Sequence, residues 1–194
     1  MGSSVLKLVA GGFAILRLGN PAGASDTRLK RLAHSIEALA EKDERFLHRS
    51  REIAALRRAA AAELHTICRD FVSSLNRLLS QGAVALDPEQ FSDSGFHENG
   101  VNLLQISVRG RILQMSFSAT PELVSTEDFR VPYILAGSVH AFNQELLEKE
   151  VIEEQLLFYT VEKHAKMWRF FDPRTYRSGG FDRHYLVSVM EQLI

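Results

Sequence analysis

Residues 24–81 read ASDTRLKRLAHSIEALAEKDERFLHRSREIAALRRAAAAELHTICRDFVSSLNRLLSQ, and they decide the fold because they contain neither glycine nor proline. These two residues disfavour the interior of a helix more than any others. Ser25 or Asp26 can accept hydrogen bonds from the first-turn amides, and Gly82 is a natural stop. The stretch therefore predicts one long helix over residues 25–81.

Apolar side chains recur along this helix at the spacing of a heptad repeat. With Leu29 at position a, the d row is nearly all apolar and the e row carries no charge. Two-stranded coiled coils usually place charges at e, so a stripe of a, d and e positions suits a bundle or a helix packed on other elements. The residues expected to mediate oligomerisation are Leu29, Leu32, Ile36, Leu39, Phe46 and Ile53.

The a row is interrupted by Asp43, Ser50 and Arg57, which divide the helix into two halves. These polar side chains could set the register of an assembly, or they could face water where the stripe drifts towards e. We expect residues 26–56 to associate with another chain and residues 57–81 to pack on the C-terminal module. At 1.5 Å per residue the helix would be about 80 Å long, which exceeds a compact domain of this size. A break at RRAAAAE into two antiparallel helices is the alternative.

The segment VNLLQISVRGRILQMSFS, residues 101–118, predicts a β-hairpin. Apolar and polar residues alternate on both sides of a two-residue turn at Gly110–Arg111, so that Arg109 would pair with Ile112. Glycine in the first turn position suits a type II′ turn. In this register the large apolar side chains share one face, and the glutamines and serines share the other.

A second hairpin is predicted in LLFYTVEKHAKMWRFFD, residues 156–172, with its turn at His164–Ala165. This register pairs Tyr159 with Phe170, so that large side chains cover one face of the two strands. Other large apolar residues of the same strands fall on the opposite face. We therefore expect this hairpin to be buried on both sides.

Together these elements predict an α+β fold. Residues 133–143 alternate as a strand does, with a helix opened by Pro132 as the alternative, and Asp182 can cap a terminal helix. The expected architecture is a long N-terminal helix, coiled-coil or bundle-like, followed by an antiparallel sheet of four or five strands and a C-terminal helix. The expected domains are an apolar tail or edge element over residues 1–24, an oligomerisation arm over 25–81 and an antiparallel α+β module over 82–194.

The overall composition gives no argument for nucleic-acid or membrane binding. The net charge is −1 and the pI is near 6.7, so either role would need a local patch. The apolar residues 5–18 are interrupted by charges and glycines and are too few to span a bilayer. Cys68 is the only cysteine, which rules out an intramolecular disulfide and fits a reducing compartment. We therefore expect a cytoplasmic protein that does not attach to a membrane.

No motif in the sequence selects a reaction, because it lacks the P-loop, dinucleotide-binding, nucleophile-elbow and HExxH patterns. A metal or acid–base site could form only if His164, Asp172 and His184 converged in space. The dense acidic run ELLEKEVIEE, residues 145–154, is typical of a solvated face. The sequence thus indicates no catalytic residue, no metal and no cofactor.

Basic and aromatic residues interleave in KHAKMWRFFDPRTYRSGGF, residues 163–181. Such a combination can clamp phosphates and stack bases, and Gly179–Gly180 ahead of a helix could offer amides to an anion. The alternative is that the aromatic rings belong to the core while the basic residues meet the acidic run. The candidate residues for binding an anion or a partner are Lys166, Trp168, Arg169, Arg174, Tyr176 and Arg177.

The leading hypothesis is a non-enzymatic, oligomeric assembly or adaptor protein, in which the helix mediates self-association and the sheet module binds a partner protein. It follows from a seam larger than the chain can easily bury alone and from the lack of a catalytic motif. The alternative is a nucleic-acid- or nucleotide-binding accessory subunit that uses residues 163–181. A small enzyme with a site at His164, Asp172 and His184 is a second alternative.

Overall fold

The computed structural model describes residues 21–81, 83–127, 129–142, 154–162 and 165–194. Contacts between residues divide the chain into two units, residues 1–48 and residues 49–194, and each is described by itself. The tail or edge element expected over residues 1–24 lies almost entirely outside the described residues.

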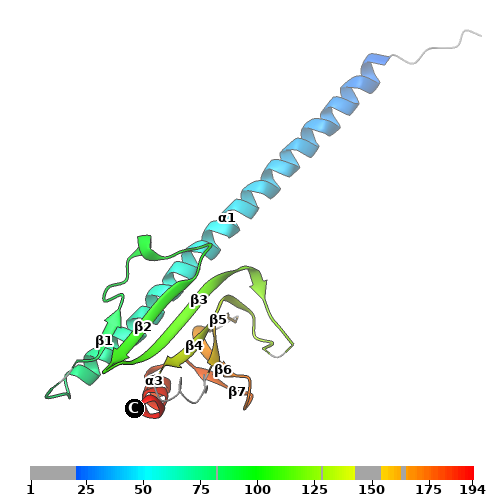
Figure 1. The fold of residues 1–194 in the computed structure, drawn as a ribbon. Coiled ribbons are helices and arrows are strands. Elements are labelled where there is room, and N and C mark those ends of the chain that lie inside the picture. Colours follow the sequence, from blue (N-terminus) through cyan, green and yellow to red (C-terminus); the bar gives the residue numbers. More distant parts are fainter. Residues whose placement is uncertain (1–20, 82, 128, 143–153, 163–164) are drawn as a thin grey trace, which may run out of the picture. The chain divides into compact units, whose positions relative to one another are not determined.

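One helix, α1 (Pro21–Asn76), accounts for most of the stretch that contains neither glycine nor proline (Figure 1). The prediction of a long uninterrupted helix is confirmed, and the alternative break at RRAAAAE is wrong. The helix ends at Asn76 rather than at Gln81. The Asn76 side-chain amide donates to the Val84 carbonyl and its oxygen accepts from the Val84 amide, both at 2.8 Å. These two bonds fix the point where the chain leaves the helix.

Seven antiparallel strands form one sheet in which each strand pairs with the next along the chain (Figure 1). They are β1 (Ala85–Asp87), β2 (Asn102–Val108), β3 (Arg111–Val124), β4 (Tyr133–Phe142), β5 (Glu154–Val161), β6 (Lys166–Asp172) and β7 (Arg177–Gly180). A sheet of four or five strands was expected, and that number is wrong. The two edge strands were missed because β1 has three residues and β7 has four, too few to show an alternating pattern.

The first hairpin, β2–β3, keeps its predicted faces, but its register differs by two residues. Arg109 and Gly110 form the turn with φ angles of 48° and 81°, and Val108 pairs with Arg111. Two positive φ angles are typical of a type I′ turn, whose twist matches that of the flanking strands, so the predicted type II′ turn is wrong. A shift of two residues leaves every side chain on its own face. The buried apolar residues are Leu104, Ile106, Leu113, Met115 and Phe117.

The second hairpin, β5–β6, also differs by two residues from the predicted register. Tyr159 pairs with Trp168 rather than with Phe170. The Glu162 amide donates to the Ala165 carbonyl at 2.9 Å. This backbone bond between the two arms of the hairpin lies one residue earlier in the chain than the predicted turn at His164–Ala165 would place it. Large apolar side chains still cover both faces of this hairpin, as predicted.

Each face of the sheet carries a hydrophobic cluster. On one face, the part of α1 after residue 56 and the helix α3 (Arg183–Leu193) pack on the strands, which confirms the packing predicted for the C-terminal half of α1. The indole Nε1 of Trp168 donates to the Ala60 carbonyl at 2.7 Å and joins helix to sheet. The other cluster consists of four buried rings, Phe129, Tyr133, Phe158 and Phe171.

Two further predictions are confirmed by the second unit. The strand expected over residues 133–143 is β4, and the alternative helix is wrong. Asp182 caps α3, since its carboxylate accepts a hydrogen bond from the Tyr185 amide at 3.0 Å. Within the described parts of the chain, no helix is both long enough and apolar enough to cross a membrane.

Candidate functional site

The apolar stripe on residues 26–48 is exposed along its whole length. Six large apolar side chains have 54–72% of their surface exposed. They are Leu29, Leu32, Ile36, Leu39, Phe46 and Leu47. Five of these were predicted for oligomerisation; the sixth predicted residue, Ile53, lies in the second unit and is half-buried. Leu47 was not included, although its place in the uncharged e row marks it as part of the same stripe.

Charged side chains occupy much of the remaining surface of this part of α1. Lys30 pairs with Asp26 at 3.2 Å, and Arg45 pairs with Glu41 at 2.9 Å, each across one turn. Exposed pairs of this kind stabilise a helix by only about 0.3–0.5 kcal/mol. They support the helix, but they do not remove the exposed apolar surface from water.

Arg57, one of the three polar a residues, is buried in the second unit, so neither role expected of it applies. Its guanidinium donates to the Glu98 carboxylate and to the Thr120 carbonyl, and it thereby ties α1 to the β1–β2 connection and to β3. Only 10% of the Arg57 side chain and 30% of the Glu98 side chain are exposed. Asp43 and Ser50, by contrast, are exposed to solvent. The heptad pattern alone did not distinguish the buried arginine from its solvated neighbours.

The two central residues of the basic–aromatic segment stabilise the sheet. Trp168 is buried, and its ring meets those of Phe117 and Tyr159 in edge-to-face geometry, with centroids 5.2 and 5.4 Å away. It therefore has no free face on which a base could stack. Arg169 lies on the opposite face of β6, where its guanidinium pairs with Glu162 at 3.3 Å. The burial of Trp168 is expected if the aromatic residues belong to the core, whereas the partner of Arg169 is Glu162 rather than a residue of the acidic run 145–154.

Arg174 and Tyr176 lie in the turn between β6 and β7 and Arg177 begins β7, whereas Lys166 does not join them. Tyr176 is 74% exposed and adopts a positive φ of 54°. Lys166 begins β6, whereas Arg177 pairs with Asp172 at the end of that strand. At about 3.3 Å per residue, Lys166 and Arg177 are about 20 Å apart. The candidate residues thus form one small exposed cluster rather than a continuous patch.

A groove of about 690 Å³ beside β7 and α3 has both Asp172 and His184 in its lining, whereas His164 lies outside the described residues. Burial opposes ionisation of Asp172, but hydrogen bonds from Arg174 and Thr175 outweigh that effect and hold its pKa below the ordinary value. A paired, ionised carboxylate is a weak general base and cannot act as an acid. In the described ranges, no three His, Cys, Asp or Glu residues are placed to hold a metal ion.

A hollow between α1 and the β1–β2 connection was not predicted from the sequence. Its volume is about 310 Å³ and its walls are mainly apolar, with Phe91 on one side and Val101 and Leu103 among its exposed residues. The Nε2 atom of His65 lies 2.9 Å from the Pro88 carbonyl oxygen and fixes the loop to the helix. No sequence signal marks this hollow, because the loop that encloses it shows no regular apolar spacing.

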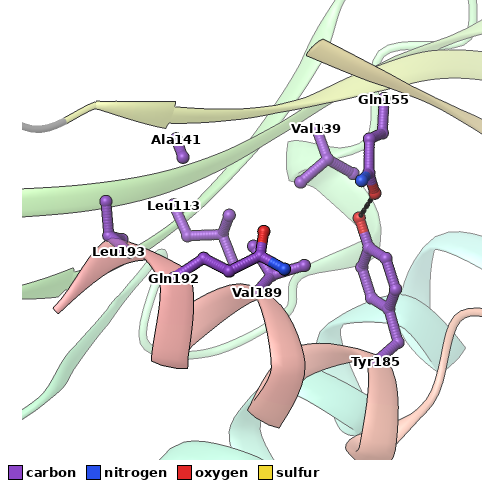
Figure 2. Close-up of a pocket in the computed structure, with 8 residues that line it drawn as sticks. All are labelled: Leu113, Val139, Ala141, Gln155, Tyr185, Val189, Gln192 and Leu193. Carbon is purple, nitrogen blue, oxygen red and sulfur yellow. Dashed lines mark hydrogen bonds between the residues drawn. The ribbon is translucent and has the colours of Figure 1, made fainter. Parts of the chain in front are cut away.

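A smaller cavity, about 160 Å³, lies between α3 and strands β3 to β5 (Figure 2). The Tyr185 hydroxyl donates to the side-chain oxygen of Gln155 at 2.7 Å on one side of it. Burial, together with the negative charge of Asp172, raises the pKa of Tyr185 and keeps it neutral. Ligand pockets usually exceed about 300 Å³, so this cavity is too small for a typical ligand.

The chain was also compared with known proteins. No protein-family model, no curated protein and no solved structure matches it. Its function therefore has to be inferred from the placement of its own residues. The apolar stripe on residues 26–48 is a row of large apolar side chains exposed to solvent.

Proposed function

We propose that the protein is a non-enzymatic assembly protein, in which residues 26–56 of α1 join copies of the chain and the sheet module binds a partner protein. The observation that carries this proposal is the row of six large apolar side chains exposed on residues 26–48. Large exposed apolar patches on soluble proteins mark sites of interaction. Full burial of one Leu or Ile side chain contributes about 1.5–3 kcal/mol, so covering this row would drive association strongly.

The second half of α1 provides an internal comparison for the first. Leu64, Cys68 and Phe71 continue the same stripe, and all three are buried against the sheet module. One helix therefore carries a stripe that is covered in residues 60–72 and uncovered in residues 29–47. The comparison supports a cover for the first half that comes from another chain.

The hollow beside His65 supports the second part of the proposal, a partner that binds the sheet module. Its volume of about 310 Å³ can accept one large side chain, and Val101 and Leu103 extend its apolar surface. Interfaces often depend on a few buried aromatic or arginine anchors seated in such hollows. We therefore place the partner-binding surface on the β1–β2 connection and the start of β2.

The oligomeric state tests the proposal directly. Light scattering at micromolar concentration should show a dimer or larger for the parent chain and a monomer for the variant Leu32→Glu/Ile36→Glu. The matched control is His34→Glu/Ala38→Glu, which adds the same charge on the other side of the helix and should leave the assembly intact. Fluorescence of Trp168 should be unchanged in both variants, because the second unit is untouched. A monomeric parent chain would refute the proposal.

The nucleic-acid alternative retains one supporting observation, the exposed cluster of Arg174, Tyr176 and Arg177 in the β6–β7 turn. An exposed aromatic ring between two basic residues can stack a base while the cations contact phosphates. The variant Arg174→Ala/Arg177→Ala separates the alternatives when oligomer size and retention on nucleic acid are both measured. Loss of the oligomer with unchanged retention would rule out nucleic-acid binding by this cluster.

A further inference from the structure

A groove runs between α1 and β1, the short strand at one edge of the sheet. Its volume is about 930 Å³, and it adjoins the hollow beside His65, since His65, Gln90 and Phe91 line both. In the described sheet β1 pairs with β2 alone, so its other edge is open. Such an edge offers backbone N–H and C=O groups to a partner.

Hydrogen bonding within the sheet decides which groups of β1 face the groove. Along a strand of an antiparallel sheet, the N–H and C=O of successive residues point alternately to one neighbour and to the other. In β2, Val108 closes the two-residue turn and bonds to β3, so Ser107, the preceding residue, points to β1. Its partner in β1 is Ala85. Leu86 follows Ala85, so its N–H and C=O point away from β2.

The hydrogen bonds on either side of Leu86 show that this direction is towards α1. Val84, two residues earlier, bonds through its N–H and its C=O to the side-chain amide of Asn76, both at 2.8 Å. Pro88, two residues later, accepts from Nε2 of His65 at 2.9 Å. Among the hydrogen bonds of the described residues, none joins the backbone of Leu86 to the helix. Leu86 therefore presents an open donor and acceptor to the groove.

The chain itself shows which group satisfies such a pair. The Asn76 carboxamide bonds both the N–H and the C=O of one residue, Val84. The Asn102 carboxamide does the same for His97, since its oxygen accepts from the His97 amide at 2.8 Å and its nitrogen donates to the His97 carbonyl at 3.1 Å. A carboxamide carries a donor and an acceptor side by side. A carboxylate has no donor and an ammonium has no acceptor, so neither can bond both groups.

From this geometry we propose that the backbone of Leu86 binds the side-chain carboxamide of an asparagine or glutamine that belongs to the partner protein. The inference rests on the proposed function, since it names a residue type of the partner that binds the sheet module. The groove suits a neutral group. Its only acidic or basic side chains besides His65 are Arg69 and Glu89, which are opposite in sign and exposed.

The flanking bonds limit what can bind. A whole strand added to this edge would need the backbone groups of Val84 and Pro88 as well as those of Leu86. Asn76 and His65 already occupy them. A single carboxamide at Leu86 leaves both of these contacts in place. An apolar anchor of the same partner can bind in the hollow at the same time, because the groove and the hollow share a wall.

Amide hydrogen exchange tests the premise in the free protein. The Leu86 amide should exchange at least about tenfold faster than the amides of Ala85 and Asp87, which bond to β2. Equal protection of the three amides would overturn the proposal, because Leu86 would then already have a partner within the chain.

Peptide selection tests the ligand. A random dodecapeptide display library is cleared on the variant Leu86→Pro and then selected on the parent chain. Proline removes the N–H of residue 86 but no bond to β2, and an edge strand tolerates proline at such a position. We expect the retained peptides to share an asparagine or glutamine, and its replacement by the corresponding acid should raise the dissociation constant about tenfold. Bound peptide should also slow exchange of the Leu86 amide, a readout that does not depend on the proline variant.

Leu86→Ala is the matched control, because it shortens the same side chain but keeps the N–H. The selected peptides should bind it as tightly as they bind the parent. Peptides that need no amide residue, that lose equal affinity on both variants, or that leave Leu86 exchange unchanged would overturn the proposal.

These measurements separate the failure of this inference from that of the proposed function. Peptides that bind in the hollow without any dependence on Leu86 would refute the carboxamide site and leave the sheet module as a partner-binding surface. A parent chain that selects no peptide, even from an uncleared library, would refute both. A monomeric parent chain in light scattering refutes self-association and changes none of the results expected at Leu86.

Discussion

The ion pair between Arg57 and Glu98 should be one of the strongest single interactions between α1 and the sheet module. Arg57 is the only one of the three polar a residues that is buried, and its guanidinium also donates to the Thr120 carbonyl. We expect Arg57→Met and Glu98→Leu each to lower the free energy of unfolding of residues 49–194. The double variant should be no less stable than either single variant.

The magnitude follows from the exposure of the two side chains. Removing one member of a buried ion pair costs about 3–5 kcal/mol, because the other charge remains without a partner. Glu98 keeps 30% of its side chain in water, so loss of Arg57 should cost about 3 kcal/mol. Arg57 is only 10% exposed, so loss of Glu98 should cost about 4 kcal/mol. Removing both charges leaves no buried ion, and the double variant should lose about 1–2 kcal/mol from packing and from the Thr120 bond.

Urea unfolding of the four proteins provides the assay. The single tryptophan, Trp168, is buried between helix and sheet and reports the loss of this packing by fluorescence. Arg58→Met is the matched control, since Arg58 is the exposed neighbour of Arg57 and its loss should change stability by less than about 0.5 kcal/mol. If the losses in the two single variants add to give the loss in the double variant, the two charges do not act as a pair and the reasoning is wrong.

Three further predictions concern single residues. Gly137→Ala should destabilise the sheet by more than about 3 kcal/mol, because the new Cβ atom would lie 1.9 Å from the Ser116 carbonyl oxygen; a melting temperature close to that of the parent would contradict this. Burial and the charge of Glu63 raise the pKa of Tyr159 to about 12, so the folded chain holds a proton that the unfolded chain releases near pH 10, and stability should fall between about pH 10 and pH 12. In alkaline urea titrations Tyr159→Phe should show a smaller fall, and an identical curve would argue against the assignment. Cys68 should not react with Ellman's reagent until the protein is unfolded, since it is fully buried; rapid labelling of the native chain would show that the core opens.

Local patterns in the sequence predicted most of the helices and strands of the fold. The lack of glycine and proline predicted α1, the alternation of residues 101–118 predicted a hairpin and its two faces, and Asp182 marked the start of α3. Each of these depends on spacing within one segment, which the sequence displays directly. The same patterns could not define register, because a shift of two residues leaves every side chain on the same face. Backbone geometry at Arg109 and Gly110 decided that question instead.

The candidate site, too, could be predicted from the sequence only in part. The exposed stripe of α1 could be predicted, since heptad spacing is a property of one helix. The hollow beside His65 could not, because it depends on which loops and strand ends meet. Arg174, Tyr176 and Arg177 were predicted as part of a larger set, but the burial of Trp168 and the distance to Lys166 depend on the folded sheet.

By itself, then, the sequence determined the two long hairpins, the helices and the apolar faces of these elements, but not the short edge strands β1 and β7. The tertiary structure decided which apolar faces are covered and which polar groups are buried. Arg57 shows the reason most clearly. In the sequence it resembles Asp43 and Ser50, yet it is buried because Glu98 and Thr120, 41 and 63 residues away along the chain, supply its hydrogen bonds. The burial of a charge depends on partners that only the folded chain brings together.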